Sequence, residues 1–157
     1  MPTTIVTPDQ DTLVTEIYIA APPERVFLAL SDSKQQRVWW SKDNCLHRSF
    51  EMDARRGGKW NFSTEQTGST VNGVSQFDCT GEILEYDPPR VLTYTWIASW
   101  HNDKKRKTVV RWELSPKGSG TLVKVTHSGL AQEDVARKDY AGGWPGVLER
   151  LKKYMEK

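Results

Sequence analysis

The chain has 157 residues, which is enough for one domain that buries most of its apolar surface without disulfide bonds or a structural metal. Its 22 lysine and arginine residues barely exceed its 20 aspartate and glutamate residues, so a partner held mainly by charge, such as a nucleic acid, is not expected. Seven tryptophans, five tyrosines and four phenylalanines predict a core rich in aromatic rings.

Residues 1–10 carry neither the basic region nor the apolar stretch of a secretion signal, and no run of about 18 apolar residues occurs anywhere in the chain. We therefore expect a cytoplasmic protein without a membrane span. The two cysteines, Cys45 and Cys79, are too few for a disulfide framework, and we expect both to be reduced thiols.

The chain is expected to consist of a flexible N-terminal segment at 1–10 and a single domain at 11–157. The first element of the domain is a strand at 13–20, where β-branched residues share one face. Two adjacent prolines then suit the first turn of a short helix at 22–31, and a second short helical segment follows at 34–40.

Beyond these helices the apolar residues alternate in short segments that are separated by turn residues. This alternation predicts strands at 46–50, 57–62, 74–85, 91–97, 108–114 and 121–127. The short connections favour one curved antiparallel sheet of about six to seven strands in an α+β fold.

Apolar residues recur at spacings of three and four between Trp144 and Met155, which predicts an amphipathic C-terminal helix. The helix is expected to begin at Trp144, or at the earliest near Glu133. Its charged residues, Arg150 among them, are expected to cover the side that faces solvent. The sheet would wrap around the apolar side of this helix.

Several blocks of the sequence, in this order along the chain, resemble a known family, the proteins similar to the activator of the heat-shock-protein-90 ATPase. The blocks are AAPPERVF at 20–27, GGKW at 57–60, GEILEYDPPR at 81–90, TYTW at 93–96, GT at 120–121, THSGL at 126–130 and GGW at 142–144. The resemblance implies a helix-grip fold of the START-like (SRPBCC) superfamily, with a cavity between the sheet and the C-terminal helix. Members of that superfamily carry, cyclise, sequester or regulate, so the fold alone does not determine the function.

An aromatic set that shares strand faces is formed by Trp60, Phe62, Tyr94, Trp96 and Trp112. Alternation alone favours an ordinary packed core for these rings. Ligand cavities, however, are lined mainly by apolar and aromatic side chains, and the resemblance implies such a cavity. We therefore expect some members of the set to contact a ligand.

The C-terminal helix supplies the other predicted wall of the cavity, with Trp144, Leu148 and Leu151 on its apolar stripe. His127 shares a predicted face with two valines and points inward, where it is either a hydrogen-bonded core residue or a ligand contact. Asp78 is expected to face solvent, because an unpaired buried carboxylate is costly. No second acid or base is spaced to pair with it.

Other site types fit the sequence poorly. The three histidines are widely separated, and Cys45 with His47 gives only two candidate ligands, so neither a metal nor another cofactor is expected. Residues 73–77 lack the final glycine of a nucleophile elbow, and we assign no catalytic residue. The basic run at 104–107 is expected to be a solvated loop.

The leading hypothesis is a non-enzymatic binding protein whose cavity holds a small hydrophobic molecule, aromatic or polyketide-like. One alternative is a chaperone-associated regulator that resembles the heat-shock-protein-90 ATPase activator. The eukaryotic activator carries an additional N-terminal domain, and this chain has only a short segment before its first strand, which argues against that role. A second alternative is a cyclase- or hydrolase-like enzyme, which would need a paired acid and base inside the cavity.

Overall fold

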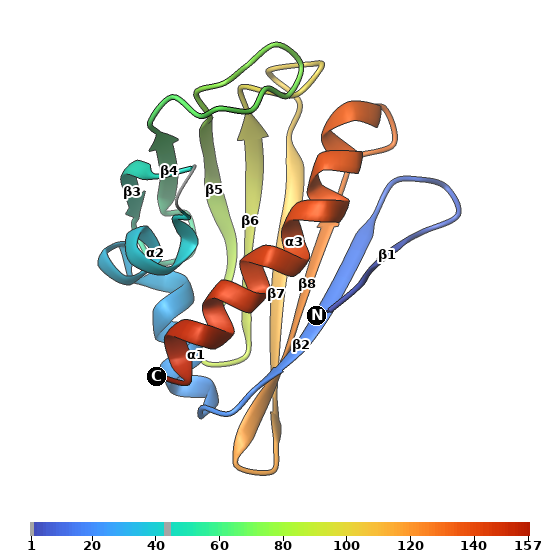
Figure 1. Ribbon diagram of the computed structural model, residues 1–157. Helices are drawn as coiled ribbons and strands as arrows, with labels where there is room; N and C mark the ends of the chain where they lie inside the picture. The colour runs from blue at the N-terminus through green and yellow to red at the C-terminus, as the bar shows by residue number, and fades with distance from the viewer. Residues whose placement is uncertain (1, 43–44) are drawn as a thin grey trace.

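The computed structural model describes residues 2–42 and 45–157, so Met1 of the expected N-terminal segment and residues 43–44 lie outside the description. The described chain forms one antiparallel sheet of eight strands in the order β1-β2-β8-β7-β6-β5-β4-β3, which curls around the C-terminal helix (Figure 1). The strands are β1 (Thr4–Val6), β2 (Leu13–Ile19), β3 (His47–Met52), β4 (Lys59–Thr64), β5 (Asp78–Asp87), β6 (Val91–Ala98), β7 (Thr108–Lys117) and β8 (Gly120–Ser128).

The strand count exceeds the predicted six to seven because of β1, which pairs with β2 so that Thr4 lies opposite Thr15. This strand lies within the segment at 1–10 that the sequence left outside the domain. Three residues are too few to display an alternating pattern, which is why the prediction missed it. The predicted strand at 74–85 also begins later, at Asp78, and residues 74–77 belong to the long loop after β4.

Two short helices, α1 (Pro23–Ser31) and α2 (Ser33–Trp40), connect β2 to β3. Pro23 opens α1, where a missing backbone N–H costs nothing. Asp32 ends α1 and caps α2, because its side chain accepts a hydrogen bond from the Lys34 backbone N–H over 3.2 Å. Trp39 and Trp40 at the end of α2 are both buried, and the Trp40 ring contacts Phe50, Phe62 and Trp96 of the sheet.

The C-terminal helix, α3 (Asp134–Met155), crosses one face of the sheet diagonally from the end near β8 to α1 (Figure 1). The helix begins close to Glu133, which is the earlier of the two predicted starts. Leu148 and Leu151 are fully buried beneath it, and Pro145 lies inside it. Beyond its last turn, the Glu156 carboxylate accepts a hydrogen bond from the Ala20 backbone N–H over 2.8 Å, which ties the helix to β2.

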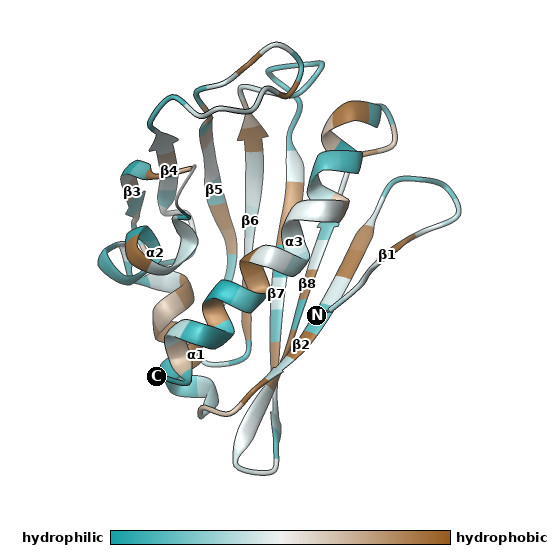
Figure 2. Ribbon diagram, viewed as in Figure 1, coloured by the Kyte–Doolittle hydropathy of each residue, from teal (hydrophilic) through white to brown (hydrophobic). Residues whose placement is uncertain are grey.

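Hydrophobic and hydrophilic residues alternate along the strands and along α3 (Figure 2), and the apolar residues meet between the helix and the sheet. The core there contains Trp60, Tyr94 and Trp112, each at most 1% exposed. None of the helices in the described ranges has the length and apolar character needed to cross a lipid bilayer.

Candidate functional site

A cavity of about 280 Å³ lies between α3, from Asp139 to Arg150, and the ends of β4 and β6. Aromatic rings make up much of its wall: Trp40, Phe62, Phe77, Trp96, Trp100 and Trp144. Its volume is close to the lower end of the range for small-molecule sites, about 300 Å³, and its mainly apolar wall is typical of them. The space suits a ligand of one or two fused rings.

Three of the eight α3 residues that line the cavity are glycines. Gly142, Gly143 and Gly146 face it, and a Cβ atom added at Gly142 or Gly143 would meet nothing within 4 Å. Each glycine in a helix interior costs about 1 kcal/mol relative to alanine. Pro145 adds to this by removing one helical hydrogen bond. The middle of α3 is therefore built from poor helix formers at the place where the cavity needs room.

A polar rim occupies one end of the cavity, where Lys42 and Cys45 of the α2–β3 connection and His47 at the start of β3 lie near Arg150 of α3. His47 Nδ1 lies 3.1 Å from Ser41 Oγ, and that hydroxyl donates its own proton to the Arg37 carbonyl. His47 therefore donates from Nδ1, which leaves Nε2 as an acceptor. Burial, assisted by the neighbouring arginines, lowers the pKa of His47 to about 4, so the ring is neutral at physiological pH.

Arg150 departs from the prediction, because it lies on the cavity wall and not on the solvent side of α3. It follows Gly146 by four residues and Gly143 by seven, so it shares their helical face. Its Nε donates to the Trp40 carbonyl over 3.1 Å. Burial lowers the pKa of the guanidinium, with Cys45 acting in the opposite direction.

His127 is fully buried, as predicted from its position on the same strand face as two valines of β8. Both of its ring nitrogens have hydrogen-bond partners. Trp144 Nε1 donates to His127 Nδ1 over 3.2 Å, so the proton of the neutral ring is on Nε2. That nitrogen lies 2.8 Å from Thr108 Oγ1, which donates in turn to the Trp96 carbonyl. Burial holds the pKa of His127 well below its usual value.

A second buried network joins the sheet to the first half of α3. Trp96 Nε1 donates to the Tyr140 hydroxyl over 2.8 Å, and His101 Nε2 lies 2.7 Å from the same oxygen. Burial raises the pKa of Tyr140 well above its ordinary value. These bonds fix the Trp96 ring and the Tyr140 ring at the edge of the cavity, so this part of its wall is rigid before any ligand arrives.

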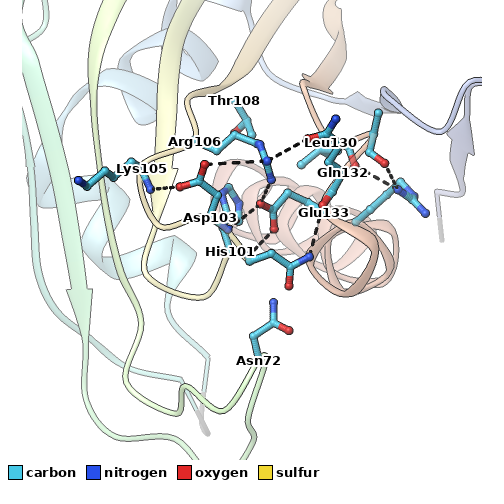
Figure 3. Close-up of polar contacts among 12 residues, drawn as sticks. Asn72, His101, Asp103, Lys105, Arg106, Thr108, Leu130, Gln132 and Glu133 are labelled. Atoms are coloured by element: carbon cyan, nitrogen blue, oxygen red, sulfur yellow. Dashed lines mark hydrogen bonds and ion pairs between the residues drawn. The ribbon is translucent and has the colours of Figure 1, made fainter.

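The loop between β6 and β7 is anchored to the start of α3 by Glu133, a fully buried carboxylate (Figure 3). It accepts hydrogen bonds from the backbone N–H groups of Asn102 and Asp103 and forms an ion pair with Arg106. Arg106 belongs to the basic run at 104–107, so one member of that run is a structural anchor and not a freely solvated side chain. The adjoining Trp100 is held by the loop after β4, where the Asn72 amide donates to its carbonyl over 2.8 Å.

The predicted site residues fall into two groups. Phe62, Trp96 and Trp144 line the cavity. The remaining six are buried in the packed core and are not among the residues that line the cavity: Trp60, Tyr94, Trp112, His127, Leu148 and Leu151. The ligand contacts predicted for these six stay predictions.

Sequence reasoning missed Trp40, Trp100, His47 and Arg150 as parts of the cavity wall. Trp100 lies in a turn after β6, outside any alternating segment, and His47 was considered only as a metal ligand. The signal that pointed to this place was the cluster of Gly142, Gly143, Pro145 and Gly146 inside a helical stripe, since such residues weaken a helix unless space is required.

The structure brings together few groups suited to metal binding or acid–base chemistry. Among residues 2–42 and 45–157 no three histidine, cysteine or acidic side chains lie close enough to hold a metal ion. Asp78 faces solvent as predicted and accepts a hydrogen bond from Ser63. Cys79 is fully buried, and burial raises the pKa of its thiol well above the usual value.

Comparison with family models matches residues 20–156 to the family described as activator of Hsp90 ATPase homolog 1-like protein. The chain belongs to this family. The match confirms the resemblance seen in the sequence blocks. A comparison with curated proteins found no match.

Solved structures share the fold along almost the whole chain. Protein CV1439 from Chromobacterium violaceum has 23% sequence identity and a TM-score of 0.79, and the alignment covers 94% of this chain and 99% of that one. Protein MLL2253 from Mesorhizobium loti has 27% identity and a TM-score of 0.72, covering 92% and 96%. CalU16 from Micromonospora echinospora has 23% identity and a TM-score of 0.65, covering 99% and 83%.

Proposed function

We propose that this protein binds a small, mainly apolar molecule with an aromatic or polyketide-like body in the cavity between α3 and the sheet, within the cytoplasm. The observation that carries the proposal is the cavity of about 280 Å³ whose wall combines aromatic rings with a helix face of three glycines. An ordinary core would fill this space with side chains, as the same helix does further along at Leu148 and Leu151.

Binding would be driven by removal of apolar surface from water, at roughly 25 cal/mol per Å², less the cost of immobilising the ligand. Phe62, Trp96 and Trp144 are the predicted residues placed to contact it, together with Trp40 and Trp100. Because the networks through Tyr140 and His127 already fix Trp96 and Trp144, little side-chain ordering is needed on binding.

The test is a panel of flavonoid-like, polyketide-like and fatty-acyl compounds, with tryptophan fluorescence and melting temperature both measured. A binder should quench fluorescence and raise the melting temperature, and above Kd the stabilisation should grow with the logarithm of the ligand concentration. Gly143→Leu should fill the cavity and weaken binding about tenfold or more, because the ligand and the new side chain compete for one space.

Lys153→Leu is the matched control, since it adds the same side chain to an exposed position of the same helix. It should bind as the unmodified protein does. A panel that changes neither fluorescence nor melting temperature would refute the proposal, and so would equal binding by Gly143→Leu and the unmodified protein.

A chaperone-associated role is the second candidate, and the family match is the observation that favours it. Its test is the ATPase rate of a purified heat-shock-protein-90 chaperone during titration with this protein. Saturable stimulation that Gly143→Leu leaves unchanged would place the chaperone contact outside the cavity and favour this role over ligand binding.

A further inference from the structure

Among the described residues that line the polar rim of the cavity, positive charges outnumber negative ones. Lys42 and Arg150 are the two cations that line it, and Asp139 at the exposed mouth is the one carboxylate among the described lining residues. Within the described chain, no ion pair involves any of these three side chains. His47 beside them is neutral, so it does not add charge of either sign.

Arg150 is held in place although no acid pairs with it among the described residues. Its Nε is bonded to the Trp40 carbonyl, and its Nη1 lies beside Gly146, 3.3 Å from the point where a Cβ would stand. The absence of a side chain at Gly146 therefore leaves room for the guanidinium at the cavity wall. Arg150 is half-buried at this wall, and a carboxylate that binds its guanidinium through two parallel hydrogen bonds would offset the cost of removing the cation from water.

Lys42 and Arg150 lie near Cys45, at the α2–β3 end of the cavity. Burial raises the pKa of the Cys45 thiol, both cations act to lower it, and the Asp139 carboxylate acts to raise it. Two cations and one carboxylate therefore lie at this end among the described lining residues. The aromatic rings Phe62, Trp96 and Trp100 lie along the rest of the wall. The cavity is thus amphipathic, with a cationic end and an aromatic body.

From this arrangement we infer that the ligand is an aromatic carboxylate, whose acid group is bound by Arg150 with support from Lys42 and whose ring lies against the aromatic wall. The inference rests on the proposed function, because it names the ligand class of the same cavity. His47 Nε2 offers an acceptor to a hydroxyl group on such a ligand.

The experiment compares two probes of the same shape, 2-naphthoate and its neutral amide, 2-naphthamide, by isothermal titration calorimetry. The unmodified protein should bind the carboxylate about tenfold or more tightly than the amide, since a hydrogen bond to a charged group is stronger than one between neutral groups. Arg150→Met should remove most of that preference and leave the amide affinity unchanged. Arg150→Lys, which keeps the charge but loses the planar fork, should give an intermediate preference.

Arg90→Met is the matched control, because Arg90 is exposed in the turn between β5 and β6 and pairs with Asp87, away from the cavity. It should retain the full preference, and melting curves should show that each variant is folded. Equal affinity for both probes, or an equal loss of both in Arg150→Met, would overturn the carboxylate assignment while leaving the binding function standing. Failure of both probes to bind, together with failure of the flavonoid-like, polyketide-like and fatty-acyl panel, would overturn the two proposals together.

Discussion

The two halves of α3 cover the same sheet in different ways. Its second half buries Leu148 and Leu151 completely against the core that contains Trp112. Its first half presents Gly142 and Gly143 to a cavity, which continues along one side of the second half as far as Gly146, Val147 and Arg150. Aromatic rings of the sheet lie opposite both halves of the helix, so these rings do not explain why one part is packed and the other is open. The helix residues that face them make that difference.

The largest effect is expected in the packed half. Leu151→Ala should lower the free energy of unfolding by about 2–5 kcal/mol, because it removes a fully buried side chain and leaves a cavity. Denaturant titration measures this, with Lys153→Ala as a surface control expected to stay within about 0.5 kcal/mol. A cost below about 1 kcal/mol for Leu151→Ala would show that this half is as loosely packed as the first.

The next effect concerns pH and the buried histidines. The pKa of His47 is lowered to about 4 and that of His127 lies well below its usual value, whereas both titrate near 6.5 when unfolded. As the pH falls, the unfolded chain binds protons at these histidines before the folded chain does. The free energy of unfolding is therefore at its full value above pH 6.5 and declines as the pH falls towards 4. Each histidine contributes up to about 1.4 kcal/mol per pH unit within that window.

The measurement is the slope of unfolding free energy against pH between 7 and 5, for the unmodified protein and for His47→Gln. The variant should have a shallower slope, and the difference should grow as the pH falls and approach about one proton near pH 5, whatever its absolute stability. Identical slopes would mean that His47 is protonated as readily in the folded state as in the unfolded chain.

Much of the packed half could be predicted from the sequence. The alternation of β8 placed His127 inward with its neighbouring valines, and helical spacing placed Leu148 and Leu151 on the buried stripe of α3. Such patterns work because each buried residue fills space that its neighbours define. β1 was missed because three residues show no period, and its position comes from pairing with β2.

The cavity half was less predictable, for a physical reason. A cavity is space that side chains leave empty. The periodic spacing of apolar residues in a sequence indicates only which side chains fill space. Arg150 was assigned to solvent because charged residues usually lie there, but the open space beside Gly146 lets its guanidinium lie on the cavity wall. Trp100 depends on a loop geometry that Glu133 and Asn72 fix through contacts distant in sequence.

A smaller difference in stability is expected between variants of Trp144 and Trp100, two tryptophans that both line the cavity. Trp144 donates from Nε1 to His127, whereas Trp100 Nε1 is buried without a hydrogen-bond partner in the described structure. Replacement by phenylalanine removes a bond only from Trp144, so Trp144→Phe should cost about 1–3 kcal/mol more than Trp100→Phe, the penalty of an unsatisfied buried group. Unfolding free energies of the two variants decide this, and equal costs would show that the Trp144–His127 bond adds nothing.

The smallest effect is a gain in stability at the cavity. Gly142→Ala should raise the unfolding free energy by up to about 1 kcal/mol, because alanine is the better helix former and its Cβ meets nothing within 4 Å. The same substitution at Gly81 of β5 should be strongly destabilising, since a Cβ there would collide with the Thr95 carbonyl, the group that accepts the Trp60 Nε1 hydrogen bond. Opposite signs for one chemical change would confirm that the space beside α3 is open and that the sheet core is full. If Gly142→Ala were destabilising, the first half of α3 would be more closely packed than the structure shows, and the cavity on which the proposed ligand binding depends would be smaller by that side chain.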